Sequence, residues 1–267
     1  MKKVVLIKGG SSGIGKAIGE YLVTKGFEVF GTSRNPSNCL DTNFTLLEMD
    51  VRNIDSIHKV IQTIINTAGR IDVVINNAGV GITGPIEEIP TSEMKNNFDI
   101  NLFGPIEVMK ASLPFMRAQQ SGLIINITSI AGYMGLPFRG IYSSSKGALE
   151  LITEALRMEV KSFGVQITNV APGDFATNIA AGRYHAPVIK GSAYELSYGT
   201  TLNEMNTHVD SGNDPTEMAK AIYAIIESKE PRIHYKVGAF MQKFSIVLKR
   251  IVPDKVYEKM LMNHYKL

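Results

Sequence analysis

Short apolar runs alternate with stretches of helical periodicity along almost the whole of this 267-residue sequence. Several of the runs lack polar alternation, which is typical of strands covered on both faces. The predicted strands are Val4–Lys8, Glu28–Ser33, Phe44–Met49, Val73–Asn76, Leu123–Thr128, Gln166–Val170 and Ile233–Lys236. Helices are predicted between them, near residues 14–25, 54–68, 92–118, 141–163 and 216–228. This order predicts an α/β fold with a doubly wound parallel sheet of about seven strands and right-handed crossovers.

No linker of distinct composition divides the chain, and 44% of its residues are hydrophobic, enough for one large core. We therefore expect a single domain over residues 1–237, with a helical C-terminal extension of the same domain over residues 238–267. The longest piece without a clear period is 178–214, which is rich in Gly, Ser, Thr and Asn. An irregular segment of that length is predicted to be a lid or binding loop, or to be disordered.

The charge and the composition exclude several classes of function. A net charge of +3 is too small to indicate nucleic-acid binding. The five histidines lie far apart without metal-ligand spacing, so no metal site is predicted. No apolar run approaches the roughly 18 residues of a membrane span. The lone Cys39 cannot form an internal disulfide, and the apolar stretch at the N-terminus is too short for an export signal, so a cytoplasmic location is expected.

The first predicted strand is followed by KGGSSGIG, a glycine-rich turn. Glycine permits a tight turn and the close approach of a pyrophosphate, while the following helix offers unpaired N–H groups. The spacing differs from the G-x-G-x-x-G dinucleotide pattern, so a plain strand-to-helix turn is an equal alternative on these glycines alone. The expected phosphate-side contacts are Gly9, Ser11, Ser12, Gly13, Ile14 and Gly15.

The end of the second predicted strand favours a phosphorylated dinucleotide. Ser33 and Arg34 stand where dinucleotide folds carry an acid for the ribose 2′-OH of NAD or an arginine for the 2′-phosphate of NADP. Since the acid is missing and the arginine is present, we expect NADP(H), with a solvated arginine as the alternative. Asp50 and Val51, after the third strand, are expected near the adenine, and the alternative for Asp50 is that it caps the next helix.

Polar residues also follow the later strands. They are the N-N-A-G turn at 76–79, Ser129, and A-P-G-D-F-A-T at 171–177. Tyr142 and Lys146 are four residues apart on a predicted helix and therefore share one face. A phenol with a pKa of about 10 is a poor acid or base at neutral pH, but a nearby ammonium group lowers that pKa. A solvated surface pair is the alternative interpretation.

In their order and spacing, the glycine turn, N-N-A-G, Asn101, Ser129, Y-x-x-x-K and the P-G turn resemble the short-chain dehydrogenases/reductases. The resemblance covers residues 3 to about 236 and implies a Rossmann-type fold and oxidoreductase activity. One departure is Lys8, where the family usually has a threonine that braces the glycine turn. The sequence therefore leaves the local hydrogen bonding of that turn open, while the glycines themselves are intact.

By this resemblance, Tyr142 is the general acid in carbonyl reduction and the base in alcohol oxidation. Ser129 hydrogen-bonds the substrate oxygen, and Lys146 holds the nicotinamide ribose and tunes Tyr142. Asn101 supports a water that links Lys146 to solvent. The sequence adds a local reason, because Pro105 has no N–H for the Asn101 carbonyl, so a kink is predicted at this point of the helix. The alternative is that Pro105 only bends the helix around the core.

The resemblance implies further cofactor contacts after the fourth and sixth strands, with Pro172, Gly173 and Thr177 on the nicotinamide. Phe175 is expected to pack near the ring, and a buried aromatic with no cofactor role is its alternative. The contacts at this end are Asn77, Ala78, Gly79, Tyr142, Lys146, Pro172, Gly173, Phe175 and Thr177.

The substrate pocket is expected from residues after Ser129, from 178–214 and from the tail. Its candidates are apolar or amphipathic, namely Tyr133, Met134, Leu136, Phe138, Ile179, Tyr184, Leu196 and Met205. No arginine clamp for a carboxylate stands out, although Arg139 and Arg183 stay open as alternatives. This favours a hydrophobic alcohol or ketone, while core packing is the default role of such residues.

The tail after Gly238 is predicted to form an amphipathic, basic helix, with a second helical piece that begins at Pro253. Extended tails of this kind resemble those of the hydroxysteroid- and retinol-type branch of the family. A pocket-capping or subunit-contact helix in a homodimer or homotetramer is the favoured interpretation. Peripheral membrane contact through residues 239–264 and a merely packed surface helix are the alternatives.

The leading hypothesis is an NADP(H)-dependent oxidoreductase acting on a hydrophobic alcohol or ketone, such as a steroid-, retinoid- or lipid-like carbonyl. A non-catalytic NADP(H)-sensing protein on the same fold is the alternative, but a sensor has no need of the whole set of Asn101, Ser129, Tyr142 and Lys146. An epimerase- or dehydratase-type relative is a third hypothesis, and those relatives usually have a larger substrate domain than this chain offers.

Overall fold

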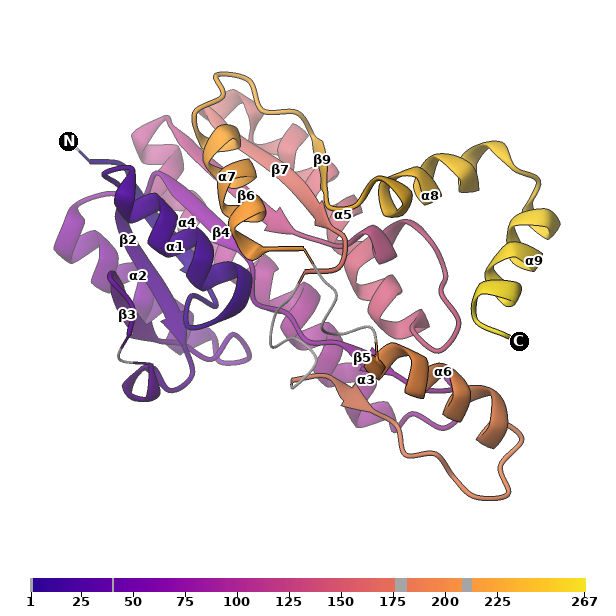
Figure 1. Ribbon diagram of the computed structural model, residues 1–267. Coiled ribbons are helices and arrows are strands. Elements are labelled where there is room, and N and C mark those ends of the chain that lie inside the picture. The colour runs from indigo at the N-terminus through magenta and orange to yellow at the C-terminus, as the bar shows by residue number, and fades with distance from the viewer. Residues whose placement is uncertain (1, 40, 176–181, 208–212) are drawn as a thin grey trace.

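The computed structural model describes residues 2–39, 41–175, 182–207 and 213–267 (Figure 1). Its main sheet has seven strands, all paired in parallel, in the order β3-β2-β1-β4-β6-β7-β9. The strands are β1 Val4–Lys8, β2 Glu28–Ser33, β3 Thr45–Glu48, β4 Val73–Asn76, β6 Gly122–Ile127, β7 Val165–Pro172 and β9 His234–Val237. The predicted doubly wound sheet is therefore confirmed, with strand ends that shift by one or two residues.

Helices cover both faces of this sheet (Figure 1). Val5 and Ile7 of β1 join a core with α1 and α7, whereas Val4 and Leu6 join a second core with α2, α4 and the end of α5. This division follows from the pleat, because successive side chains of a strand point to opposite faces. The flanking helices are α1 Gly13–Thr24, α2 Ile54–Ala68, α4 Gly104–Gln119, α5 Gly140–Glu159 and α7 Pro215–Ile226. Short 3₁₀ turns lie at Pro36–Asn38, Ile130–Tyr133 and Lys161–Phe163.

The sheet changes direction between β1 and β4. From β1 the chain builds outward through β2 and β3, and it then returns to β4 on the other side of β1. In open α/β sheets, ligands bind outside the carboxyl ends of the strands at such a switch point. The glycine turn after β1 and the N-N-A-G turn after β4 both lie there.

The helix predicted over 92–118 is divided in two. α3, Thr91–Phe98, continues through a π-helical turn at Asp99–Phe103 into α4. The N–H of Gly104 donates to the carbonyl of Asp99, one residue further back than in an α-helix. Pro105 follows directly and lacks the N–H that would otherwise bond back into this turn. The predicted irregularity near Pro105 thus corresponds to a π-turn.

The prediction that 178–214 is irregular is wrong for its described part. β8, Tyr184–His185, pairs in parallel with β5, Ile82–Thr83, and α6 occupies Glu195–Thr207. Tyr198 of α6 is 1% exposed, and its hydroxyl donates to the carbonyl of Ala186 at 2.9 Å. The helix depends on this tertiary packing, so its mixed polar sequence shows no helical period.

The tail forms two helices, α8 Phe240–Ile251 and α9 Asp254–His264. Their inner face packs through Ile246 and Tyr257 against Ile130 and Met134, next to the end of β6. The outer face of α8 carries large apolar side chains in solvent, with Phe240 72%, Met241 69% and Ile251 75% exposed. Within the described residues, no helix is both long and apolar enough to cross a bilayer.

Candidate active site

Three of the predicted catalytic residues lie on two segments that pack together. Tyr142 and Lys146 lie one turn apart near the start of α5, and Ser129 lies two residues past the end of β6. Lys146 is 4% exposed, and its Nζ donates to the carbonyl of Ile127 at 2.9 Å. A side chain added at Gly132, three residues past Ser129, would meet the Cβ of Lys146 at 3.2 Å. The turn after β6 and the helix α5 are therefore in close contact at this lysine.

Asn101, the fourth predicted catalytic residue, is buried in the π-turn. Its side-chain oxygen accepts from the N–H of Val80 at 2.8 Å, and its amide donates to Ser145 of α5 at 3.2 Å. A side chain at Gly79 would meet Asn101 Oδ1 at 3.0 Å and Lys146 Nζ at 3.2 Å. Asn101 and Lys146 thus converge on Gly79, which must lack a side chain to leave room for both.

Lys8, the departure from the family pattern, is completely buried at the end of β1. Its Nζ donates to the carbonyls of Ala78 at 2.7 Å and Ile100 at 3.0 Å. Burial lowers the pKa of Lys8 well below its ordinary value, and the positive charge of Lys146 adds to this shift. The side-chain bond to the glycine turn comes instead from Thr32, whose hydroxyl accepts from the N–H of Gly9 at 3.0 Å. The N–H of Gly9 is therefore held by Thr32, while Lys8 bonds other segments.

The glycine turn packs tightly on the N-N-A-G turn. Asn77 donates to the carbonyl of Gly9 at 2.9 Å, and a side chain at Gly15 would meet that carbonyl oxygen at 1.9 Å. α1 begins at Gly13 behind Ser12, whose side chain caps no N–H, and its first turn has no acidic residue. The N–H groups at this end of α1 therefore suit an anion such as a pyrophosphate. Ser11 and Ser12 are accessible there, whereas Ile14 is buried in the core.

The adenine side of the predicted cofactor site has one charged residue without an ion-pair partner. Arg34 is exposed after β2 and, among the described residues, pairs with no carboxylate, which suits a 2′-phosphate. Asp50 is bonded to Arg52 at 2.7 Å, and Arg52 lowers its pKa. The alternative that Asp50 caps α2 is wrong, because the cap is Asn53, which accepts from the N–H of Asp55 at 3.0 Å. The side chain of Val51 packs against Gly104, where the missing side chain leaves space for it.

The P-G turn lies at the end of β7. The N–H of Gly173 donates to the carbonyl of Val237 at 2.8 Å, and a side chain at Gly173 would collide with Gln242 of α8. Phe175 is buried in the core beneath α7, which favours the alternative of a structural aromatic. Thr177 lies outside the described residues, as does the pocket candidate Ile179.

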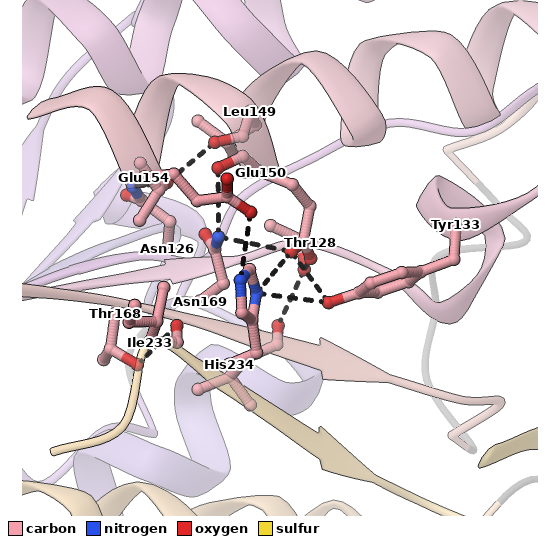
Figure 2. A network of polar contacts seen from close by, with 12 residues as sticks. Asn126, Thr128, Tyr133, Leu149, Glu150, Glu154, Thr168, Asn169, Ile233 and His234 are labelled. Carbon is pink, nitrogen blue, oxygen red and sulfur yellow. Dashed lines mark hydrogen bonds and ion pairs between the residues drawn. The ribbon is translucent and has the colours of Figure 1, made fainter. Parts of the chain in front are cut away.

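A buried polar network centred on Glu150 was not identified from the sequence. Figure 2 shows the side chains of Tyr133 and His234 directed toward the Glu150 carboxylate. The hydroxyl of Tyr133 donates to it at 2.7 Å, and Nδ1 of His234 lies 2.9 Å from it. The available signal was the spacing, because Glu150 follows Lys146 at the same four-residue interval that separates Lys146 from Tyr142.

The predicted pocket residues disperse. Tyr133 points into the Glu150 network, so its prediction as a pocket residue is wrong. Met134 is buried against the tail, where it accepts from the hydroxyl of Tyr257 at 3.1 Å. Leu196 is 83% exposed. Closer to Tyr142 are Phe138 and Tyr184, which share its apolar cluster. Leu136 packs at the edge of the tail cluster, and Met205 is half-buried on α6.

Two arginines flank Tyr142. The Arg139 guanidinium lies 5.4 Å from the centre of the Tyr142 ring. Arg183 lines a hollow of about 240 Å³ together with Val80, Gly81 and Tyr184. Burial lowers the pKa of Arg183, and the positive charge of Arg139 adds to this shift. Among the described residues, neither guanidinium forms an ion pair with a carboxylate.

The family model of the short-chain dehydrogenases matches residues 3–187. A 3-ketodihydrosphingosine reductase of Bacteroides thetaiotaomicron is 36% identical over 266 residues, which cover 99% of this chain and 98% of the relative. An NADPH-dependent 3-dehydrocapnine reductase of Ornithobacterium rhinotracheale is 29% identical over 99% of this chain and 98% of the relative. Human retinol dehydrogenase 8 is 32% identical over 86% of this chain and 79% of the relative.

Solved structures agree on the fold. A short-chain dehydrogenase of Streptomyces avermitilis superposes with a TM-score of 0.81 at 29% identity, covering 100% of this chain and 96% of that one. The structure of ElxO with NADP bound gives a TM-score of 0.71 at 27% identity, over 89% and 97%. A Burkholderia phymatum homologue in complex with NAD gives 0.81 at 23% identity, over 93% of each chain. Similar proteins therefore hold either dinucleotide.

Proposed function

Since the chain belongs to the short-chain dehydrogenase/reductase family, we propose that it transfers a hydride between NADP(H) and a hydrophobic alcohol or ketone. The observation that carries this proposal is the convergence of Lys146 and Asn101 on Gly79, with Tyr142 one helical turn from Lys146. A binding protein without catalysis has no use for an ammonium group buried beside a tyrosine and a serine. The oxidoreductase therefore ranks above the alternative, a non-catalytic NADP(H)-sensing protein.

The proposed roles follow from where each side chain lies. Tyr142 gives its proton to the substrate oxygen in reduction and takes it back in oxidation. Ser129, at the end of β6, donates a hydrogen bond to the same oxygen. Lys146 and Asn101 hold the nicotinamide ribose and the proton path behind Tyr142. When bound, the dinucleotide supplies the hydride.

NADP(H) is the proposed cofactor form. The uncapped start of α1 would hold the pyrophosphate, and Arg34 would meet the 2′-phosphate. The absence of an acidic side chain at Ser33 and Arg34 supports this choice, because an acid would repel the phosphate. One relative of similar length carries NADPH in its name.

The proposed substrate is a lipid-like ketone with a polar or anionic group near its carbonyl. The relatives named for 3-ketodihydrosphingosine, 3-dehydrocapnine and retinol support a lipid-like substrate. Arg139 and Arg183 support the polar group, because two guanidinium groups that repel each other beside Tyr142 are stabilised when an acceptor bridges them.

We also propose that residues 1–237 and the tail over 238–267 form one cytoplasmic domain that assembles as a homodimer or homotetramer. The inner face of the tail supports this, since it packs beside the turn that follows Ser129. The outer face of α8 is the proposed subunit contact, with a membrane surface as its alternative occupant. Helix α8 has no acidic residue, and its positive charge from Lys243, Lys249 and Arg250 would suit anionic lipids, although Lys249 donates inward to the carbonyl of Tyr133 at 3.0 Å.

The test is turnover by the purified protein. Long-chain ketones that carry an acidic group, a neutral hydroxyl or an ammonium group near the carbonyl, with 3-ketodihydrosphingosine as the last of these, are incubated with NADPH, and the loss of NADPH absorbance is followed. Wild type is expected to reduce at least one of them, and Tyr142→Phe is expected to bind NADPH but lose about 10²- to 10⁴-fold in kcat/KM. Tyr223→Phe, on α7, is the matched control and should behave as wild type. NADPH binding without turnover of any ketone or alcohol would favour the sensor instead.

A further inference from the structure

Four ionisable side chains follow one another at four-residue intervals along α5. They are Tyr142, Lys146, Glu150 and Glu154, and this spacing places them on one face of the helix. The two in the middle are buried, with Lys146 4% and Glu150 5% exposed. Lysine and glutamate are almost never fully buried without a partner. A buried amine and a buried carboxylate one turn apart therefore need an explanation beyond the folding of the helix.

The carboxylate of Glu150 accepts hydrogen bonds from donors on three other segments. Tyr133 OH lies at 2.7 Å, Asn169 Nδ2 at 3.2 Å and His234 Nδ1 at 2.9 Å, and the hydroxyl of Thr128 also donates to it (Figure 2). An ionised carboxylate accepts about four hydrogen bonds and donates none, which matches this set.

His234 connects this carboxylate to solvent at the sheet edge. It lies on the edge strand β9, and its other ring nitrogen, Nε2, lies 3.0 Å from Glu154 at the surface. Each ring nitrogen thus faces a carboxylate. Figure 2 shows the ring between the two acids.

Consecutive residues at the end of β6 hold Lys146 and Glu150. The carbonyl of Ile127 accepts from Lys146 Nζ at 2.9 Å, and the hydroxyl of the next residue, Thr128, donates to Glu150. Ser129 follows directly. The strand end that carries the proposed substrate-binding serine therefore also fixes the amine and the carboxylate relative to each other.

Charges of both signs act on Lys146. Burial lowers its pKa, and the charges of Tyr142 and Glu150 oppose that shift. Lys8 is a second buried amine whose charge interacts unfavourably with Lys146. Around Glu150, the titratable and charged neighbours are Tyr133, His234, Glu154, Arg250 and Lys236, the last two acting through Tyr133.

We propose that Glu150, held in place by His234, is a positioning residue whose fixed negative charge keeps the buried amine of Lys146 protonated for catalysis. This rests on the proposed oxidoreductase function, in which a charged Lys146 serves Tyr142. Burial of Lys146 removes the water that would stabilise its charged form. The negative charge of Glu150 replaces part of that stabilisation. Nothing in the family resemblance assigned a role to residue 150.

The test is the pH profile of kcat/KM for ketone reduction, which needs the protonated forms of Tyr142 and Lys146. Glu150→Gln keeps the shape but removes the charge, so the alkaline limb should move to lower pH by about one unit or more. Glu154→Gln removes a half-exposed carboxylate on the same histidine, and water screens it, so the limb should stay in place. His234→Asn removes the ring and keeps the charge of Glu150, so it should not shift the limb downward as Glu150→Gln does.

A purely structural role predicts a different pattern. If Glu150→Gln lowers kcat/KM equally at every pH, or if His234→Asn moves the limb down as Glu150→Gln does, disorder and not charge is responsible and the proposal is wrong. Melting temperatures of all three variants identify any loss of folding. His234→Asn keeps the proposal testable should Glu150→Gln not fold.

A readout without turnover separates this proposal from the proposed function. In protein labelled with ¹³C at lysine Cε, the NMR titration of Lys146 is assigned through Lys146→Met. The Lys146 resonance of Glu150→Gln should titrate at lower pH than that of wild type. This result would support the charge relationship even if no ketone were reduced, and an unchanged titration would overturn it even if turnover were found.

Discussion

The Nζ of Lys8 donates to the carbonyl of Ala78 at 2.7 Å, which ties the end of β1 to the turn after β4. A second bond, to the carbonyl of Ile100 at 3.0 Å, ties the same amine to the π-turn before α4. Because Lys8 is 0% exposed, water does not compete for either carbonyl. One side chain thus joins three segments around the proposed nicotinamide site.

Replacing Lys8 by methionine should destabilise the protein. The apolar chain fills similar space but leaves the carbonyls of Ala78 and Ile100 without their donor, at a cost of about 1–3 kcal/mol in the free energy of unfolding. Urea unfolding of wild type and Lys8→Met measures this difference. Lys2→Met, at the exposed N-terminus, is the control and should leave stability unchanged.

The buried amine of Lys8 also gives a prediction for the pH dependence of stability. The pKa of Lys8 is lowered in the folded protein, so between that value and the ordinary 10.5 the unfolded chain binds more protons. The contribution of Lys8 to the free energy of unfolding must therefore increase as pH rises through that window. The destabilisation by Lys8→Met should be larger at pH values near the top of the window than at neutral pH. A difference that stays constant or shrinks would mean that Lys8 is charged in the fold.

Most strands of the main sheet, such as β1 and β4, could be predicted because they are compact apolar runs that lie buried in the sheet. α6 could not be predicted, because Tyr198 stabilises it by reaching the carbonyls of Thr83 and Ala186 across a tertiary contact. The π-turn was foreseen only as an irregularity at Pro105, since the register of a helix bond is not encoded by one proline.

The candidate site likewise contains residues that could be predicted from the sequence and residues that could not. Asn101 and Lys146 could be placed by motif, and the structure brings both to Gly79. Tyr133 was misassigned to the pocket, because the direction of its ring depends on Glu150 and His234, which lie far from it in sequence. Long-range polar partners of this kind have no local signature.

The cofactor preference should follow from Ser33 and Arg34. Hydrogen bonds to charged groups contribute about 1.5–3 kcal/mol each, so wild type should prefer NADPH to NADH by roughly tenfold or more in kcat/KM. Ser33→Asp combined with Arg34→Leu supplies an acceptor for the ribose hydroxyls and removes the phosphate partner, so preference should move toward NADH. Arg117→Leu, at the end of α4, is the control and should leave the ratio unchanged. Equal use of both cofactors by wild type would make Arg34 an ordinary surface residue.

The two arginines near Tyr142 should discriminate between substrates. Arg139→Gln and Arg183→Gln each remove one positive charge beside the Tyr142 ring. For a ketone with an acidic group near its carbonyl, KM should rise by about tenfold, as expected for one lost charged hydrogen bond. For the matched neutral ketone KM should change little. Equal losses on both ketones would indicate that the arginines only support the fold of the pocket.

Substitutions on the outer and inner faces of the tail should have different effects. Phe240→Ser with Ile251→Ser alters only exposed residues of α8, so the fold and the NADPH affinity should be unchanged. If this face is a subunit contact, each lost apolar contact costs about 1.5–3 kcal/mol and the dimer dissociation constant should rise more than tenfold.

Tyr257→Ala, on the inner face, instead removes the packing on Met134 and should raise the KM for the ketone without changing the subunit number. Light scattering after size-exclusion chromatography measures the assembly. A wild-type monomer that sediments with anionic vesicles, and loses this binding in Phe240→Ser with Ile251→Ser, would show that the outer face meets a membrane surface and not a second subunit.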